Sequence, residues 1–421
     1  MATNETDARL VGKERRDTER HERVRRLLDE HDVDALVVRL PENVLLLAGF
    51  WPMIGLSHAV FSREGGAMCL IPECYEAEAE AELAGVTPYY FPHGRKDSPP
   101  APDEIRRLLG ALPGSDAWKR VAWEASAEAT APAWNAADAF FPSAPTARLL
   151  SDAFSRAHLE DGTSILAELK RTKTPLEIER MGRASEIANI GLAAFERAVE
   201  PGRSGVELAA LVEHAVMAEG SGRHGTRRVR AFAQVAVGGA EGRIGFRPNE
   251  ISTTRRLAEG EIALLELGVV VDGYWSDRTR PCVAGTPSTE QLEAFEVVRR
   301  AQEAAIAAVA PGVEAGAVDE AARGVIREAG MDSLFPHIVG HGVGFAYHEP
   351  SPIIRPGSTE LLEAGMVHTV EPGVYDAALG GIRIEDDVVV TQGGAVVLGP
   401  FRKELSGRER SVGGGADSSG G

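Results

Sequence analysis

The pattern of apolar and polar residues changes period several times in the first part of the chain. Glu19–His31 carries apolar residues with the spacing of an amphipathic helix, and Glu76–Ala84 is rich in Ala and Glu, which favour helices. Val33–Arg39, Ala67–Ile71 and Val121–Trp123 are short apolar runs of strand length. Strands and helices that follow one another in this way predict a mixed α/β domain.

The second part is predicted to begin with long helices and to continue with short strands. Pro175 can open a helix with Thr174 as its N-cap, because proline needs no N–H partner in the first turn. From Phe232 onward, short β-like runs separated by glycines replace the helical pattern. The predicted helices are Ser164–Lys173, Pro175 to about Val199, Gly205–Glu219, Ser288–Ala310 and Glu314–Ala329. We place the domain boundary between Phe154 and Lys170.

The charge of the chain argues against one class of partner. Asp and Glu number 63 against 45 Lys and Arg, so the formal net charge is −18. A surface of that sign repels phosphate unless it carries a concentrated basic patch, so we expect no nucleic-acid partner. The basic run from Arg15 to Arg26 alternates with acidic residues, and we interpret it as a solvated helix face with ion pairs.

Cysteine usage and hydropathy favour a cytoplasmic protein. The three cysteines (Cys69, Cys74 and Cys282) form no CxxC pair, which argues against a disulfide scaffold and a cysteine-ligated zinc site. No apolar run approaches the roughly 20 residues of a membrane helix. Residues 1–21 are charged throughout and lack the apolar stretch of a secretory signal. We therefore expect no membrane partner.

The strongest local signal is a predicted hairpin around the Asp-Gly dipeptide at 272–273, which separates two β-rich runs and favours a two-residue turn. With that turn, Gly268 faces Asp277 on the partner strand. In the same register, Glu266 faces Thr279. Since side chains alternate between the two faces of a strand, Glu266 and Asp277 share one face as diagonal neighbours.

Two carboxylates that converge from paired strands are candidates for holding one or two cations. In the alternative interpretation, Glu266 is a lone acid on a solvent face. Asp277 would then form an ion pair with Arg278 or Arg280. The hairpin by itself slightly favours this second interpretation.

Two further segments carry candidate ligands. His341 lies among glycines that let the backbone approach a bound group, and His348 follows seven residues later. Glu371 ends an apolar strand-like run, and Glu385 lies inside another. A carboxylate in a buried strand is costly unless it is paired or binds a metal, although Glu385 alone has Arg383 as a possible partner.

Taken together, the candidate metal ligands are Glu266, Asp277, His341, Glu371 and Glu385. Four carboxylates in one pocket repel each other unless cations neutralise them. Oxygen-rich ligation with one nitrogen suits Mn²⁺ best, with Co²⁺, Zn²⁺ and Fe²⁺ as alternatives. Carboxylates can bridge two such ions about 3.5–4 Å apart, a geometry that activates water for hydrolysis.

At this point the chain resembles a known family, the metallopeptidases of the pita-bread fold, which include Xaa-Pro aminopeptidases, Xaa-Pro dipeptidases (prolidases) and methionine aminopeptidases. The matching segments are ELGVVVDGYWSDRTR, GHGVGFAYHEP, TVEPGVY and GIRIEDDVVVT, and they occur in the family's order and spacing. VDALVVRLPENVLLLAGF resembles the extra N-terminal domain of creatinase and of the proline-specific members. ELKRTKTPLEIERM resembles the join between the two domains.

The resemblance implies an α/β (α+β) fold of two domains. A mixed α/β, creatinase-like domain would cover 19–165. A pita-bread catalytic domain with a curved, mainly antiparallel sheet and covering helices would cover 166–405. Residues 1–18 would be a flexible N-terminus, and 406–421 a disordered tail.

The resemblance also assigns roles to particular residues. It makes Asp277, His341, Glu371 and Glu385 ligands of two divalent ions, with Glu371 also accepting a proton from the water. His348 would contact the substrate carbonyl or the leaving nitrogen. Arg383 matches an arginine that is typical of the proline-specific branch. The partners implied are a small peptide substrate and a second copy of the chain in a homodimer.

Two positions depart from the family pattern. The first ligand position is normally Asp, whereas here it is Glu266, whose side chain is one methylene longer. The peptidases also carry a histidine upstream, and here Gly245 or Asn249 takes its place, depending on where a gap is drawn. The loss removes a group that would contact the scissile region.

The leading hypothesis is therefore a metallopeptidase that uses a metal-activated water to cleave the bond between an N-terminal amino acid and proline. The first alternative is a hydrolase of the same fold that acts on a small non-peptide C–N bond, as creatinase and ectoine hydrolase do, with little or no metal. Glu266 and the missing histidine favour that alternative, and the intact ligand set opposes it. The second alternative is a binding protein without activity, since fold alone does not fix function.

Overall fold

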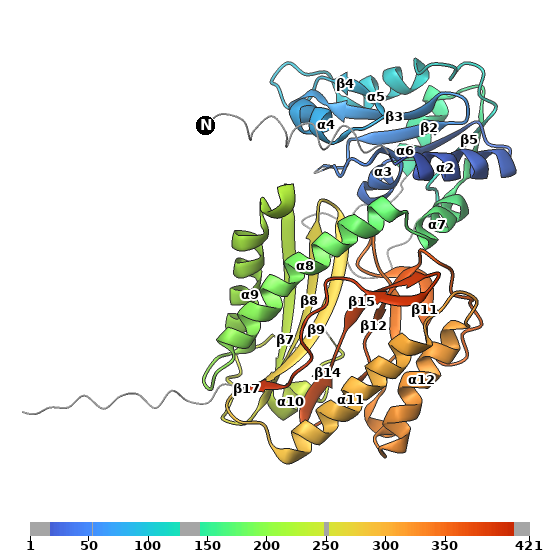
Figure 1. Cartoon of the computed structure of the whole chain (residues 1–421). Coiled ribbons are helices and arrows are strands. Elements are labelled where there is room, and N and C mark those ends of the chain that lie inside the picture. Colours follow the sequence, from blue (N-terminus) through green and yellow to red (C-terminus); the bar gives the residue numbers. More distant parts are fainter. Residues whose placement is uncertain (1–16, 53, 127–143, 248–251, 408–421) are drawn as a thin grey trace, which may run out of the picture.

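The computed structural model describes residues 17–52, 54–126, 144–247 and 252–407. In the first part of the chain, six strands form one mixed sheet, in the order β4-β3-β2-β1-β5-β6 (Figure 1). β1 pairs antiparallel with β2 and parallel with β5. The strands are β1 (Ala35–Val38), β2 (His58–Ser62), β3 (Gly66–Pro72), β4 (Thr87–Phe91), β5 (Arg120–Trp123) and β6 (His158–Asp161).

Helices accompany this sheet, and its core is apolar. The sequence predicted β1, β3 and β5 and three of the helices, α2, α4 and α7. It missed β2, β4 and β6, of which β4 is an edge strand that carries a proline and is only partly buried. The helices are α2 (Thr18–Glu30), α3 (Pro41–Ala48), α4 (Glu76–Glu82), α5 (Ala101–Gly110), α6 (Ala144–Ala153) and α7 (Thr163–Arg171), with a 3-10 turn η1 (Glu73–Tyr75).

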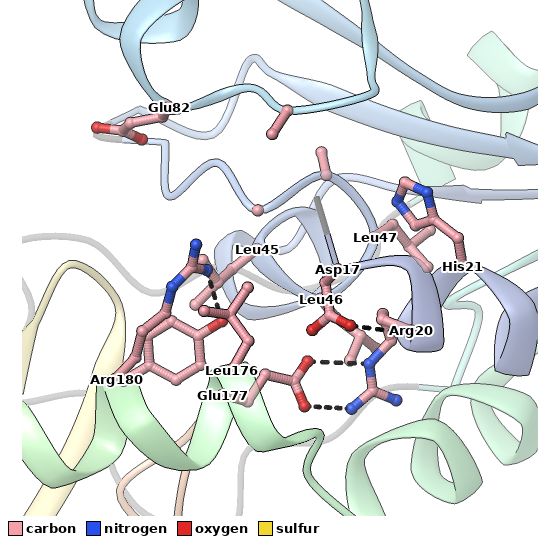
Figure 2. A pocket seen from close by; sticks show the side chains of 14 residues that line it. Asp17, Arg20, His21, Leu45, Leu46, Leu47, Glu82, Leu176, Glu177 and Arg180 are labelled. Atoms are coloured by element: carbon pink, nitrogen blue, oxygen red, sulfur yellow. Dashed lines mark hydrogen bonds and ion pairs between the residues drawn. The ribbon is translucent and has the colours of Figure 1, made fainter. Parts of the chain in front are cut away.

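The sequence predicted a solvated basic face for α2, but one arginine of this helix is buried. Arg20 is buried and forms two contacts with the Glu177 carboxylate, Nε to Oε1 at 2.9 Å and Nη2 to Oε2 at 2.5 Å (Figure 2). Its guanidinium also donates to the backbone oxygen of Leu169. Because the partners of Arg20 are far away in sequence, the local pattern could not show that this arginine joins α2 to the helices that follow the first sheet.

Within the described residues of the second part, the helices are five longer elements and two short turns. Thr174 caps α8 as predicted, and its hydroxyl and the Glu177 side chain form a reciprocal capping box. The predicted helix ends agree with the structure within two residues. The elements are α8 (Pro175–Ala198), α9 (Gly205–Gly220), α10 (Gly238–Gly242), α11 (Thr289–Ala308) and α12 (Ala315–Glu328), with η3 (Arg223–Gly225) and η5 (Asp332–Leu334).

The strands of the second part form three sheets. One has the order β17-β9-β8-β7, another β11-β10-β12-β15-β16, and β13 pairs with β14. All their pairings are antiparallel except that of β17 with β9. The strands are β7 (Val229–Val237), β8 (Ile262–Val271), β9 (Tyr274–Val283), β10 (Gly340–Gly342), β11 (Glu349–Ile354), β12 (Val367–Val370), β13 (Gly373–Asp376), β14 (Gly380–Arg383), β15 (Asp386–Thr391), β16 (Gly394–Val397) and β17 (Ser406–Gly407).

Helices flank these sheets in two pairs. α8 and α9 pack on β7, β8 and β9, whereas α11 and α12 pack beside the second sheet (Figure 1). This arrangement confirms the predicted fold class: a mixed α/β part followed by a part with mainly antiparallel sheets and covering helices. No helix among the described residues combines the length and hydrophobicity that a membrane span needs.

The central hairpin has the register that the sequence predicted. Gly268 pairs with Asp277, and Glu266 pairs with Thr279. The turn residues at 272–273 both have positive φ, 49° and 93°, as a type I′ turn requires. The Asp-Gly dipeptide therefore sets which side chains of β8 and β9 share a face.

Most residues of the predicted N-terminal segment (1–18) and tail (406–421) lie outside the described residues. Within the described part, Asp17 caps α2 by accepting from the Arg20 N–H. Ser406 and Gly407 form β17 beside β9. The division proposed near residue 165 falls in α7, between the last strand of the first sheet and α8.

Candidate metal centre

Five different places in the second part of the chain supply the candidate ligands. Glu266 lies on β8 and Asp277 on β9, and His341 lies on the short strand β10. Glu371 follows the end of β12. The sequence placed Glu385 inside a strand, but the structure places it between β14 and β15, where the chain crosses from one sheet to another.

Two carboxylates approach the same nitrogen of His341. Asp277 Oδ2 and Glu371 Oε1 each lie 3.6 Å from His341 Nε2. The other ring nitrogen, Nδ1, lies 3.0 Å from the backbone oxygen of Gly342. Because a carbonyl only accepts, Nδ1 carries the proton there and Nε2 keeps its lone pair toward the carboxylates. This orientation suits a metal ligand.

The ligand atoms are close enough to hold an ion. His341, Glu371 and Glu385 form one group of potential ligands whose atoms all lie within 4.8 Å of one another, and Asp277, His341 and His348 form a second. Oxygen-rich groups with imidazole suit a divalent transition metal. The donor chemistry of these residues therefore fits a divalent metal ion.

Burial and mutual repulsion hold protons on these acids in the absence of a cation. Burial, together with the nearby Glu385 charge, raises the pKa of Glu371 to about 8. The pKa values of Asp277 and Glu385 also lie well above the usual range, first because both side chains are buried and then because their charges repel. A divalent cation would remove this penalty by replacing the protons.

Thr279 and Arg383 orient one side of the cluster. The Thr279 hydroxyl donates to Glu385 Oε2 at 2.5 Å and accepts from Arg383 Nε at 3.0 Å. Arg383 Nη1 donates to the Tyr375 hydroxyl at 2.9 Å, and its Nη2 contacts Glu266 Oε2 at 2.6 Å. Arg383 therefore joins residues from β8, β9, β13 and β14.

Glu266 does not stand on a solvent face, as one interpretation of the hairpin held. Its Oε1 accepts a hydrogen bond from the Tyr347 hydroxyl at 3.0 Å, and its Oε2 accepts one from Arg383. The hairpin pattern could not show this, because both partners lie about a hundred residues further along the chain. Sequence reasoning missed Tyr347, although its place directly before His348 was a usable signal.

Asp277 does not pair with the neighbouring arginines, as that interpretation also held. Arg278 and Arg280 point to the other face and contact Asp386 Oδ1 at 2.9 Å and 2.7 Å. Asp386 directly follows Glu385, so the two side chains point to opposite faces. Asp386 therefore pairs with the two arginines, whereas Glu385 faces His341.

His348 lies beside His341, with 4.2 Å between the ring centroids. Burial lowers the pKa of His348 to about 4, so the ring is neutral at neutral pH. Its Nδ1 is buried without a hydrogen-bond partner among the described residues. At the edge of the cluster, Nδ1 of this ring can therefore still form a hydrogen bond with another group.

The region of the missing upstream histidine is only partly described. Gly245 follows α10 and packs against β7 and β8, whereas Asn249 lies outside the described residues. Phe246 stacks near His337, with 6.3 Å between the ring centroids. His337 Nε2 lies 2.8 Å from the Tyr375 hydroxyl, which sequence reasoning did not single out. His337 is therefore linked to Arg383 through the Tyr375 hydroxyl, although His337 lies in a different segment from the missing upstream histidine.

Comparison with known proteins places this centre in a family. The family model for metallopeptidase family M24 matches residues 179–392, which contain all five candidate ligands. This chain belongs to metallopeptidase family M24. The predicted family is thus confirmed, and with it the class of enzyme, a hydrolase that acts on peptides with the help of divalent metal. The family match gives no support to the non-peptide hydrolase alternative.

Three similar proteins extend this M24 assignment. The Xaa-Pro dipeptidase of Pyrococcus furiosus is 35% identical over 241 residues, which are 57% of this chain and 66% of that protein. The prolidase structure from Pyrococcus horikoshii matches with a TM-score of 0.72 and 26% identity, over 92% of this chain and 100% of that one. The X-Pro aminopeptidase structure from Thermotoga maritima matches with a TM-score of 0.75 and 25% identity, over the same shares.

Proposed function

We propose that this M24 protein hydrolyses the amide bond between an N-terminal amino acid and proline, as an Xaa-Pro dipeptidase or aminopeptidase. The observation that carries the proposal is the approach of Asp277 and Glu371 to the same nitrogen of His341, with Glu385 in reach. The names of the similar proteins supply the substrate class. The substrate is then a small peptide with proline in second position.

Asp277, His341, Glu371 and Glu385 would hold the divalent metal. The ion supplies activation of a water molecule and polarisation of the scissile carbonyl. Mn²⁺ is the ion that these ligands favour, and the family resemblance predicts two ions. The number of ions depends on Glu266, because that residue has protein partners on both of its oxygens.

The surrounding residues have separate tasks in this proposal. Glu371 accepts the proton that the attacking water loses, which is the role that the family resemblance assigns to it. His348, a neutral imidazole at the edge of the cluster, contacts the substrate carbonyl or the leaving nitrogen. Arg383 contacts substrate and holds Glu266. A homodimer in the cytoplasm is part of the same proposal.

The test is a metal-dependent peptide assay. The purified chain is stripped with EDTA, reloaded with Mn²⁺, and given Ala-Pro, Ala-Pro-Ala and the matched peptide Ala-Ala, with creatine as a non-peptide substrate. We expect turnover of proline peptides that disappears with EDTA and returns with Mn²⁺. Cleavage of creatine alone, or no cleavage of any proline peptide with Mn²⁺, Co²⁺ or Zn²⁺, would contradict the proposal.

A further inference from the structure

The Tyr347 hydroxyl lies between two of the candidate ligands. It is 3.0 Å from Glu266 Oε1 and 3.0 Å from Asp277 Oδ1. The other oxygen of Asp277, Oδ2, is the one that faces His341. The two oxygens of Asp277 therefore contact different groups: Oδ2 faces His341, and Oδ1 is in contact with the Tyr347 hydroxyl.

The β8 strand leaves room for this tyrosine. A Cβ atom at position 268 would lie 2.8 Å from the Tyr347 ring, so only glycine allows the ring to lie over the strand at this point. Gly268 is two residues from Glu266 and faces Asp277 across the hairpin. Trp275 also packs against the Tyr347 ring, with 5.4 Å between the ring centroids. The hydroxyl is thereby held between the two acids.

The longer acid at position 266 completes the arrangement. Its Oε1 faces Tyr347, and its Oε2 is 2.6 Å from Arg383, so each carboxylate oxygen already has a donor from the protein. A cation that contacted Glu266 would have to displace a hydrogen bond and compete with a guanidinium charge. Both described groups of potential ligands contain His341, and neither contains Glu266.

We propose that this centre binds a single divalent ion, held by Asp277, His341, Glu371 and Glu385, and that Tyr347 closes the position between Glu266 and Asp277 to a second ion. Tyr347 is in this sense the residue that sets the number of metal ions. The inference rests on the metal centre of the proposed function but not on the identity of the substrate. It replaces the two ions that the family resemblance implies.

Metal stoichiometry tests this directly. The full chain is loaded with excess Mn²⁺ and desalted, and bound Mn is measured by mass spectrometry together with the EPR spectrum. We expect one ion per chain and the spectrum of an isolated Mn²⁺. In the double variant Glu266→Asp/Tyr347→Val, which shortens the acid and removes the phenol, we expect two ions per chain and the spectrum of a coupled pair.

A milder variant and a matched control protect the test. Tyr347→Phe keeps the packing against Trp275 and removes only the hydroxyl, so we expect it to take up a second, weaker ion during titration with Mn²⁺. Tyr375→Phe removes another buried hydroxyl that contacts Arg383 but does not lie between two acids, and it should still bind one ion.

The results separate the two proposals. Two ions in the unmodified chain, or a Tyr347→Phe titration identical to that of the unmodified chain, would overturn the inference about Tyr347. One ion without cleavage of proline peptides would leave that inference standing and remove the proposed substrate. Cleavage of proline peptides by a chain with two ions would support the proposed substrate and overturn the inference about Tyr347.

Discussion

The acidic cluster has two ends, and the negative charge of the buried carboxylates is compensated in a different way at each end. At the first end, Asp277, Glu371 and Glu385 gather around His341, and burial with mutual repulsion raises their pKa values. At the second end, Glu266 is satisfied by donors from the protein itself. Only the first end needs a cation. The number of acids in a cluster therefore does not give the number of ions; the donors beside each acid decide it.

Arg383 shows how the difference is maintained. Its Nε lies 3.9 Å from both Glu371 Oε2 and Glu385 Oε2, whereas its Nη2 lies 2.6 Å from Glu266 Oε2. The guanidinium is thus directed at the second end, where a close ion pair is strong in a buried setting. Its weaker approach to the other two acids leaves their charge for a divalent ion to neutralise.

The largest expected effect comes from removing the imidazole at the first end. We expect His341→Ala to lose its bound metal and to reduce turnover by about 10³-fold or more, since a metal ion supplies several kcal/mol of transition-state stabilisation. Metal analysis and the proline-peptide assay measure both effects on one preparation. His224→Ala, an exposed histidine far from the cluster, serves as the control. Full metal content in His341→Ala would break the comparison between the two ends.

His348 provides a sharper test because it lies beside His341 and Asp277 but is not in the group that His341 forms with Glu371 and Glu385. We expect His348→Ala to keep its metal and to reduce kcat by about 10²-fold, the lower range for loss of a proton-transferring or hydrogen-bonding group. The measurements are bound metal and kcat with an Xaa-Pro peptide. Metal loss equal to that of His341→Ala would mean that His348 is itself a ligand and that its assigned role is wrong.

Sequence reasoning succeeded where the signal was local. The Asp-Gly turn fixed the register of β8 and β9, and with it the shared face of Glu266 and Asp277. Thr174 and Pro175 marked the start of α8 for equally local reasons. The order of the glycine, histidine and acidic segments was sufficient to identify the family, because few folds require that combination.

Sequence reasoning failed where a partner came from far along the chain. The Arg20 side chain looked like part of a solvated face, yet it is buried against Glu177. Tyr347 was not singled out from the sequence, and nothing in its own segment indicates the clearance that Gly268 provides. Tertiary contacts of this kind decide pairing and burial, and they have no signature in the periodicity of one segment.

The next effect is smaller and concerns the link between the two ends. Thr279 donates to Glu385 and accepts from Arg383, so Thr279→Val should weaken metal affinity by about 10–100-fold, the usual cost of losing a group that orients a metal ligand. Thr279→Ser keeps the hydroxyl and should bind metal nearly as well as the unmodified chain. Mn²⁺ titration by calorimetry distinguishes them. Equal affinities in both variants would show that the hydroxyl does not orient Glu385.

The smallest effect is a dependence of stability on pH that only the first end should produce. In the metal-free chain, the pKa of Glu371 is raised from 4.5 to about 8, so the folded state holds a proton that the unfolded state has lost between these values. Stability is therefore greatest below the unfolded pKa and falls as pH rises toward 8, by on the order of a few kcal/mol. Added Mn²⁺ replaces the proton, so its stabilising effect should grow over the same window.

Thermal unfolding at pH 5, 6, 7 and 8, with EDTA and with Mn²⁺, measures this dependence. Glu124, which directly follows β5 and whose pKa burial raises to about 7, contributes in the same direction and must be separated from Glu371. Glu371→Gln carries no charge at any pH, so it should flatten the metal-free profile and leave the part that Glu124, Asp277 and Glu385 cause. Glu266→Gln removes a charge that helps to raise the pKa values of all three acids at the first end, so it should flatten the profile less than Glu371→Gln does. A metal-free midpoint that rises from pH 5 to pH 8 would show that the first end does not carry uncompensated charge, and the contrast between the two ends would then fail.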